Sequence, residues 1–279
     1  MTTVVASDST FTTVSASDRA PAAAYYNLIR STSGLMAYWP MLETSGTTVA
    51  EATGTYPGTA GASTTRGSTV LLSGEPGGVT GTNVASGSQI DIGGTFANLG
   101  FAGTLPFSAE IWVENLGTST TRYIFGFLNS LTAGTSGGWR LIVSGAGALT
   151  FSRYDTTATA TAVVTGAILP FATAGVHHIA AVYTGTAASI YFDGTLAAGP
   201  TANTRVMPAL TVAPKIGRLN YSTGGAVVGR YGHAAIYNRA LTADEIAAHY
   251  TAGRNAGLDL TITPSDRSNM TVTASDAHA

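Results

Sequence analysis

The chain has 279 residues, only 10% of them charged, and a formal net charge of −2. It therefore lacks the broad basic surface that neutralises nucleic-acid phosphates or anionic lipid headgroups, and we expect neither class of partner. It contains no cysteine, which excludes disulfide bonds and thiolate metal sites.

Repeated serine–aspartate pairs mark both ends of the chain. Ser7-Asp8 recurs ten residues later as Ser17-Asp18, and Ser265-Asp266 recurs with the same spacing as Ser275-Asp276. The repeats predict an extended N-terminal arm over residues 1–20 and a C-terminal arm over residues 258–279, with turns at the Ser-Asp pairs. Two disordered polar tails are the alternative.

The N-terminal stretch has neither the basic segment nor the apolar run of a signal peptide. No apolar run in the chain reaches the length that spans a membrane. We therefore expect synthesis in the cytoplasm, no membrane insertion, and a protein that stays there or leaves as part of a larger assembly.

The first elements after the arm are a helix and a strand. Pro21 to Arg30 predicts a short helix, because proline suits a first turn and the apolar residues share one face. Leu35 to Trp39 predicts the first strand, and the Gly-, Thr- and Ala-rich segment from Thr47 to Ser68 predicts a loop.

The middle of the chain consists of short segments of strand-like alternation with no helical period between them. About twelve such strands argue for an all-β fold, an antiparallel two-sheet sandwich with short flanking helices. The predicted strands in this region are Thr69–Leu72, Ser88–Ile92, Phe107–Glu114, Arg122–Leu128, Trp139–Ser144, Leu149–Asp155, Val163–Leu169, Lys215–Arg218 and Ala226–Tyr237.

The clearest hairpin lies between Val176 and Gly194. Both halves alternate β-branched or aromatic residues with others, which predicts two antiparallel strands. The dipeptide Asp193-Gly194 supplies the positive φ angles of a tight turn, so a third strand should begin at Thr195.

One helix is predicted near the end of the domain. Thr242 and Glu245 have the spacing of a capping box, and Leu241 and Ile246 that of a hydrophobic staple. We expect Gly253 to end this helix. Its apolar face should hold the closing strand to the sandwich.

Three ordered segments resemble the laminin-G-like, concanavalin A-like jelly-roll family. The hairpin carries the matches Val176, His177, Ala180, Tyr183, Tyr191, Asp193 and Gly194. Ala37–Gly46 resembles the first strand of the family, and Gly229–Tyr250 resembles its last strand and closing helix. The resemblance covers roughly residues 25 to 255 and implies one jelly-roll domain over residues 21–257.

Glycosidases of similar architecture carry two glutamates on one strand with an aspartate between them. Glu110 and Glu114 have this spacing, but Trp112 stands where the central acid belongs. Four residues of strand span about 13 Å, whereas a retaining pair of carboxylates lies about 5 to 5.5 Å apart. We therefore expect carboxylates on a solvated sheet face and no catalytic residues.

Many laminin-G-like domains bind calcium, so the resemblance also suggests a possible calcium site. The acidic position after the first strand is Glu51 here, and Gly232 and His233 replace the acidic pair that opens the last strand. Because calcium takes six to eight oxygens, we expect no cofactor and no metal site. The adjacent His177 and His178 should point to opposite faces, and no His-His-carboxylate spacing is visible.

A sugar-binding site is a further possibility. Aromatic rings stack on the apolar faces of sugars while amides and charged groups bind the hydroxyls. The candidates are Trp139, Arg153, Tyr154, Asp155, Asn220 and Tyr221, with Trp139 and Tyr154 meeting across one hairpin.

The repeated arms loosely resemble segments of tailed-bacteriophage virion proteins. Together with the fold resemblance they suggest a non-catalytic structural, decoration or minor tail protein on the virion surface, made in the host cytoplasm. Its partners would be neighbouring virion subunits, contacted through the arms, and cell-surface glycans, and we expect a homo-oligomer. A soluble carbohydrate-binding lectin and a glycoside hydrolase are the alternatives.

Overall fold

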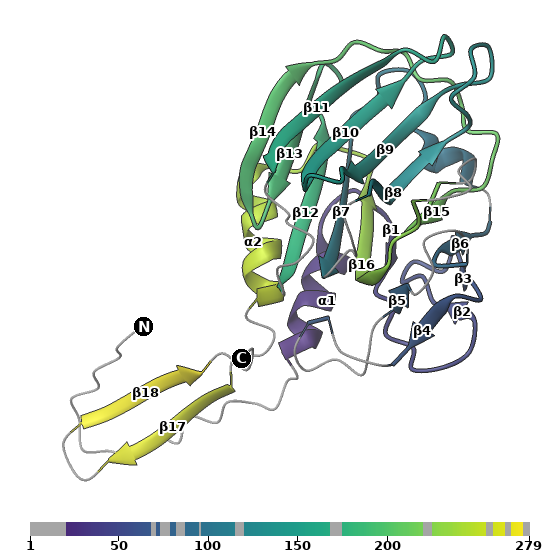
Figure 1. Cartoon of the computed structure of the whole chain (residues 1–279). Coiled ribbons are helices and arrows are strands. Elements are labelled where there is room, and N and C mark those ends of the chain that lie inside the picture. The colour runs from purple at the N-terminus through teal and green to yellow at the C-terminus, as the bar shows by residue number, and fades with distance from the viewer. Residues whose placement is uncertain are drawn as a thin grey trace.

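The computed structural model describes residues 21–67, 71–72, 79–81, 87–94, 96–114, 120–167, 175–219, 225–254, 259–265 and 269–275. The N-terminal arm predicted over residues 1–20 lies outside the described residues. Two antiparallel sheets face each other and form a sandwich, with two α-helices on the outside of one sheet (Figure 1).

The first sheet carries β7, β12 and β16 in its interior. Its order is β14-β13-β12-β7-β16-β5-β4, and β1 also pairs with β16. Its strands are β1 (Leu35–Trp39), β4 (Thr64–Arg66), β5 (Val79–Gly81), β7 (Phe107–Glu114), β12 (Val176–Tyr183), β13 (Ala187–Phe192), β14 (Thr195–Ala202) and β16 (Gly229–Tyr237). The edge strand β14 contains Pro200.

The second sheet has the order β11-β10-β9-β8-β15-β6-β3-β2. Its strands are β2 (Thr48–Val49), β3 (Gly58–Ala60), β6 (Ile90–Ile92), β8 (Arg122–Leu128), β9 (Gly138–Val143), β10 (Ala148–Tyr154), β11 (Ala160–Ala167) and β15 (Lys215–Ile216). A 3₁₀ helix, η1, covers Phe96–Gly100. The all-β, two-sheet antiparallel sandwich is thus confirmed.

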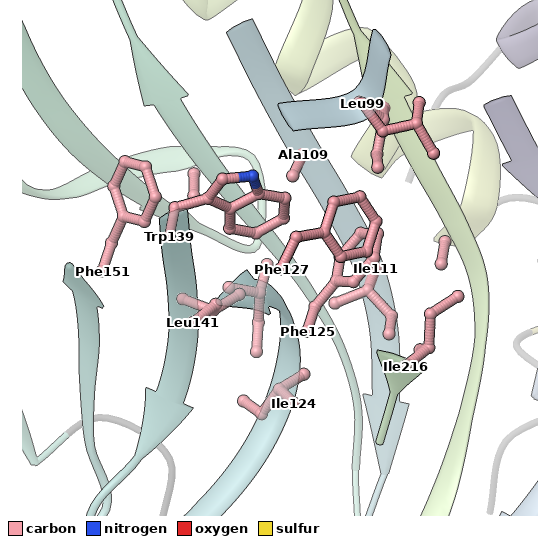
Figure 2. Close-up of a cluster of buried hydrophobic side chains, with 14 of the residues drawn as sticks. Leu99, Ala109, Ile111, Ile124, Phe125, Phe127, Trp139, Leu141, Phe151 and Ile216 are labelled. Atoms are coloured by element: carbon pink, nitrogen blue, oxygen red, sulfur yellow. The ribbon is translucent and has the colours of Figure 1, made fainter. Parts of the chain in front are cut away.

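The main core fills the space between the sheets. Aromatic rings at its centre belong to Trp139, Phe125, Phe127 and Phe151 from the second sheet and Phe107 from the first (Figure 2 shows four of them). The centroid of the Trp139 ring lies 5.2 to 6.2 Å from those of the four Phe rings. Each such side chain contributes about 1.5–3 kcal/mol when removed from water, so this cluster holds the two sheets together.

A second apolar layer covers the outer face of the first sheet. Helices α1 (Pro21–Ser31) and α2 (Ala243–Arg254) lie against this face, and Tyr25 and Ile246 pack with Trp112 and Tyr237 of the sheet. The prediction of a solvated face carrying Glu110 was therefore wrong. Alternation along β7 does place Glu110 and Trp112 on the face away from the core, but the two helices exclude water from it.

The start of α2 is as predicted, but its end is not. The Glu245 amide donates to Thr242 Oγ1 (3.2 Å), and the Thr242 amide donates to Glu245 Oε2 (2.9 Å), so the capping box is confirmed. The helix runs through Gly253 to Arg254. A Cβ on Gly253 would lie 2.2 Å from Trp112 Cζ2, so this glycine allows the helix to lie close to the indole ring rather than ending the helix.

The hairpin turn at Asp193-Gly194 is confirmed. Asp193 has φ 49° and Gly194 has φ 78°, and β14 follows directly. The Asp193 carboxylate accepts a hydrogen bond from the His178 amide (2.9 Å) and contacts His177 Nδ1 (2.8 Å). The turn is therefore held by its own side chain as well as by its backbone.

Two predictions between β1 and β6 were wrong. The segment Thr47–Ser68 contains β2, β3 and β4 rather than only loop. A strand was expected over Thr69–Leu72, but Leu71 and Leu72 are not in a strand, residues 68–70 lie outside the described residues, and β5 occurs later. Strands of two or three residues depend on the neighbours they pair with and carry no alternation of their own.

The end of the chain forms a separate two-stranded sheet. β17 (Asp259–Ser265) pairs antiparallel with β18 (Asn269–Ser275), and Figure 1 shows this hairpin apart from the sandwich, on the side where α2 ends. The hairpin lies within the predicted C-terminal arm. Among the described residues, no helix is long and apolar enough to cross a membrane.

Candidate functional site

The residues proposed for sugar binding do not come together. Trp139 is fully buried in the main core, where no face of its ring is open to a ligand. Register places Trp139 opposite Arg153, so the neighbouring Tyr154 lies on the other face of the sheet, and the two rings do not meet as expected. Asn220 and Tyr221 lie outside the described residues.

Arg153 and Tyr154 are both covered by other side chains. The guanidinium of Arg153 lies 3.4 Å from the centroid of the Tyr183 ring and donates to Asn203 Oδ1 (2.9 Å) and to the Gly103 carbonyl (3.1 Å). Tyr154 lies under the guanidinium of Arg140, 5.1 Å from the ring centroid. Arg153 therefore holds the segments around Asn203 and Gly103 in place and is covered by them.

Asp155 lies at the rim of a hollow. We call it the strand-end hollow, because it forms where β10 and β14 end and β11 begins; its volume is about 710 Å³, and it is lined by Asp155, Thr156, Thr157, Thr161, Ala202, Thr204, Arg205, Val206, Met207 and Pro208. Figure 1 shows these strand ends at the far end of the sandwich from β17 and β18.

An ion pair lies in the wall of the strand-end hollow. Arg205 Nη1 donates to Asp155 Oδ2 at 2.7 Å, and the Thr157 amide (2.9 Å) and hydroxyl (2.6 Å) donate to Asp155 Oδ1. The Thr157 hydroxyl, with help from Arg205 and against a smaller effect of burial, lowers the pKa of Asp155 to about 2. The carboxylate is therefore charged near neutral pH, with its conformation fixed.

The strand-end hollow combines features that suit a polyhydroxylated ligand. Arg205 offers planar N–H donors, Asp155 offers acceptor oxygens, and threonine hydroxyls can do both. Val206, 64% exposed, provides an apolar surface. Sequence reasoning found Asp155 but missed Arg205, which follows β14 and is 50 residues away along the chain. The only available signal was an arginine isolated in a chain poor in charge.

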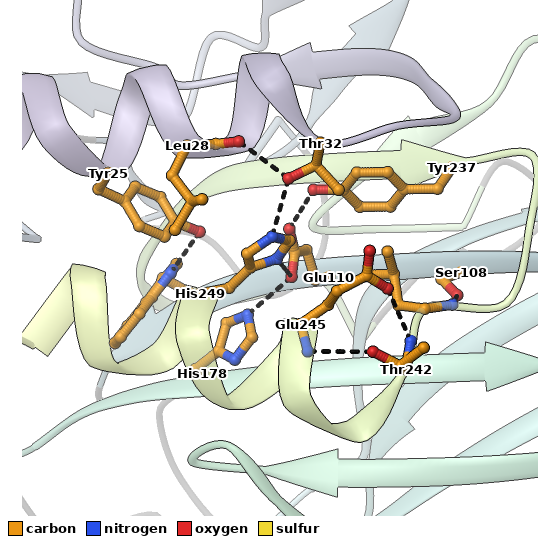
Figure 3. Close-up of polar contacts among 12 residues, drawn as sticks. Tyr25, Leu28, Thr32, Ser108, Glu110, His178, Tyr237, Thr242, Glu245 and His249 are labelled. Atoms are coloured by element: carbon orange, nitrogen blue, oxygen red, sulfur yellow. Dashed lines mark hydrogen bonds and ion pairs between the residues drawn. The ribbon is translucent and has the colours of Figure 1, made fainter.

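A second polar cluster lies beneath the helices, around Glu110 (Figure 3). His178 Nε2 lies 3.1 Å and His249 Nδ1 lies 3.0 Å from Glu110 Oε2, and the Tyr237 hydroxyl donates to Oε1 at 2.5 Å. These residues come from β7, β12, β16 and α2, so their sequence spacing gave no sign that they would meet.

The hydrogen bonds around His249 assign its protons. Thr32 Oγ1 lies 3.0 Å from His249 Nε2 and donates to the Leu28 carbonyl at 2.8 Å. Since a hydroxyl has one hydrogen, Thr32 must accept a hydrogen bond from Nε2, while Nδ1 donates to the carboxylate. Both ring nitrogens of His249 therefore carry hydrogen, and the ring is an imidazolium ion paired with Glu110.

The electrostatics agree with this assignment. Burial favours a higher pKa for Glu110, but the charge of His249 and the hydrogen bonds from both histidines outweigh it and hold the pKa well below its usual range. Burial favours a lower pKa for His249, but the Glu110 carboxylate outweighs it and raises this pKa. Burial, with the charge of Glu110, also raises the pKa of Tyr237. The cluster is a buried ion pair that joins α2 to the sheet.

The positions that the family resemblance assigned to calcium serve other purposes. Glu51 accepts hydrogen bonds from the amides of Tyr38 (2.8 Å), Thr53 (2.8 Å), Thr55 (3.0 Å) and Tyr56 (3.3 Å). His233 Nδ1 lies 2.8 Å from the Tyr38 hydroxyl. Glu51 thus organises the loop after β1, and the described residues include no group of three or more acids and histidines arranged to hold a metal ion.

Comparisons with known proteins agree with this architecture. The sequence matches the family described as the concanavalin A-like lectin/glucanases superfamily over residues 85–247, more than half of the chain. No curated protein sequence matches it.

Solved structures share the fold at low sequence identity. The receptor-binding domain of botulinum neurotoxin type G aligns over 80% of this chain and 52% of that one, with 13% identity and a TM-score of 0.57. The binding domain of Paraclostridial mosquitocidal protein 1 aligns over 81% and 53%, with 13% identity and a TM-score of 0.60. A Trypanosoma rangeli sialidase, solved with 2,3-difluorosialic acid, aligns over 82% and 34%, with 16% identity and a TM-score of 0.56. The chain thus spans about half of the toxin domains and a third of the sialidase.

Proposed function

Since the chain belongs to the concanavalin A-like lectin/glucanases superfamily, we propose that it is a non-catalytic attachment module that binds carbohydrate at the strand-end hollow. The observation that carries this proposal is the ion pair of Asp155 and Arg205 in the hollow, surrounded by threonine hydroxyls and the exposed Val206. Sites that orient a small ligand typically have a few polar groups in fixed positions beside an apolar surface.

The two glutamates that a glycosidase would use support the absence of catalysis. Glu110 is buried beneath α1 and α2, and both of its oxygens accept hydrogen bonds from the cluster around it. Glu114 forms an ion pair with Arg230. Neither carboxylate is free to act as a nucleophile on a sugar.

A glycan array with the full chain tests the carbohydrate proposal. We expect the wild-type protein to bind a defined set of glycans, and Asp155→Asn to weaken binding about tenfold or more, because a charge-assisted hydrogen bond contributes about 1.5–3 kcal/mol. Asn retains an oxygen for the Thr157 turn, so the loop should keep its shape.

Asp91→Asn is the matched control. Asp91 forms an ion pair with Lys215 in the same sheet, away from the hollow, and its replacement should leave glycan binding unchanged. Absence of binding by the wild-type chain, or equal binding by Asp155→Asn, would contradict the proposal.

The setting that we propose for this module is the surface of a virion, as a decoration or minor tail protein. The support is the serine–aspartate repeat at both chain ends, which a free lectin would not need. The strand-end hollow lies at the opposite end of the sandwich from β17 and β18, so a chain mounted through its ends would direct the hollow outward (Figure 1).

A further inference from the structure

Arg153 is a buried charge without a counter-ion. Its side chain is fully buried, and both of its hydrogen-bond acceptors, Asn203 Oδ1 and the Gly103 carbonyl, are neutral. Its Nε has no partner among the described residues, and its guanidinium lies against the face of the Tyr183 ring. No carboxylate of the described residues pairs with it. Because arginine keeps its proton in proteins, an uncompensated positive charge lies inside this end of the sandwich.

This charge lies directly behind one wall of the strand-end hollow. The wall is the chain segment 202–208, to which Asn203 belongs. Gly103 pairs with Met207 of the same segment, through backbone hydrogen bonds of 2.7 and 3.1 Å. Arg153 is therefore bonded to the wall at Asn203 and, through Gly103, to the wall at Met207.

The charges in the wall itself cancel. Asp155 and Arg205 are the charged residues among those that line the hollow, and they form an ion pair with each other. With Arg153 behind them, the three residues carry two positive charges and one negative charge. Since a buried charge is screened less than an exposed one, we expect a positive potential in the hollow.

The ion pair also leaves more donors than acceptors open. Arg205 donates from Nη1 to Asp155 Oδ2 and from Nε to Thr161 Oγ1 (3.4 Å). Its Nη2 makes no hydrogen bond to the described residues, and the side chain is 34% exposed. Asp155 Oδ1, in contrast, accepts three hydrogen bonds from Thr157 and Thr159. The open hydrogens of Arg205 favour a ligand group rich in acceptor oxygens.

We propose that the strand-end hollow selects sugars that carry a carboxylate, such as uronic acids. The carboxylate binds Arg205 Nη2, and the charge of Arg153 behind the wall favours it over a neutral group. The inference rests on the proposed carbohydrate function and names the class of sugar. Asp155 positions Arg205 for this contact, so Asp155→Asn releases the guanidinium and weakens the binding of an acidic sugar as well.

A glycan array on which each uronic-acid glycan is printed beside its methyl ester tests the inference with the full chain. The ester keeps the hydroxyls of the sugar but has no charge. We expect the wild-type protein to bind the acid about tenfold or more tightly than the ester, because the ester cannot accept a charge-assisted hydrogen bond. This preference should shrink as salt is added, because ions screen the attraction.

Charge-removing variants locate the preference. Arg205→Gln should reduce the preference for acid over ester to about twofold or less, because the donor that binds the carboxylate loses its charge. Lys215→Gln is the matched control: it removes one positive charge at the ion pair with Asp91, away from the hollow, and should leave the preference unchanged. Arg153→Met removes the buried charge and should lower the preference as well; if this variant fails to fold, the result with Arg205→Gln decides.

The outcomes separate this inference from the proposed function. Equal binding of acids and their esters by the wild-type chain would overturn the inference and leave the carbohydrate proposal standing. A preference that survives Arg205→Gln would overturn it too, because the carboxylate would then be bound elsewhere. Binding confined to sulfated sugars would overturn the assignment of a carboxylate. Absence of binding to every glycan would contradict the proposed function itself.

Discussion

Glu110 is a fully buried carboxylate that the residues around it keep charged. Its oxygens are bound by His178, His249 and Tyr237, and it is inaccessible to solvent. An unpaired charge in the interior is costly, so Glu110 and His249 depend on each other. The value of Glu110 is therefore structural: it fixes the position of α2 on the sheet.

Glu110→Gln should lower the free energy of unfolding by about 3–5 kcal/mol, because it leaves the buried imidazolium of His249 without its counter-ion. Urea unfolding followed by circular dichroism measures this loss. Glu114→Gln, the same change four residues along β7 at the partly exposed ion pair with Arg230, should cost less than about 1 kcal/mol. Equal losses in the two variants would contradict the buried ion pair.

The ion pair of Glu110 and His249 makes the free energy of unfolding depend on pH. The pKa of Glu110 lies below its unfolded value of 4.5, so its contribution is present above that pH and is lost as the pH falls through the folded pKa. The pKa of His249 lies above its unfolded value of 6.5, so its contribution is full below that pH and is lost as the pH rises through the folded pKa.

The free energy of unfolding of the wild-type protein should therefore decline as the pH rises above 6.5 and through the raised folded-state pKa of His249, and His249→Gln should make this decline less steep. Urea unfolding of both proteins at a series of pH values measures the two slopes. An unchanged slope in His249→Gln would show that other groups cause it.

At the scale of elements, the position of α2 depends on the absence of a side chain at Gly253 as well as on the capping box at its start. A methyl group on Gly253 would overlap Trp112 and push the end of the helix off the sheet. Gly253→Ala should therefore destabilise the protein by about 1–3 kcal/mol or more, although alanine favours helix. Differential scanning calorimetry measures the change.

Gly166→Ala is the control for this prediction. Gly166 lies in β11, and a Cβ there would meet nothing within 4 Å. We expect this variant to be neutral or slightly more stable, because alanine loses less backbone entropy on folding. A loss at Gly166 as large as that of Gly253→Ala would show that overlap with Trp112 is not the cause of the destabilisation.

Comparison of the predicted and observed elements shows which features could be predicted from the sequence. β7 and β8 were predicted to the residue, because both are long runs rich in β-branched and aromatic residues. The apolar faces of α1 and α2 were visible too, but not the surface that they cover, so Glu110 was assigned to solvent. In the strand-end hollow Asp155 was found and Arg205 was not, because only the folded sheets bring segments 50 residues apart together.

At the scale of the whole molecule, the sandwich and its chain ends are separable. Both cores lie within residues 25–246, and β17 and β18 pair only with each other among the described residues. A chain of residues 21–254 should therefore unfold cooperatively and keep its glycan binding.

The same truncation tests the mounting function. Full-length tagged protein, expressed while virions assemble, should band with the particles on a density gradient, whereas residues 21–254 should stay at the top. Particles that carry the truncated chain as well as the full chain would contradict a mounting function of the ends.

Pro200 gives β14 a property that matters when many copies stand close together. It occupies the open edge of the first sheet and has no amide hydrogen to donate. A strand from an adjacent molecule could not continue the ladder past this residue, so lateral fusion into fibres is blocked there. If copies are mounted close together as proposed, they should therefore remain separate molecules along this edge.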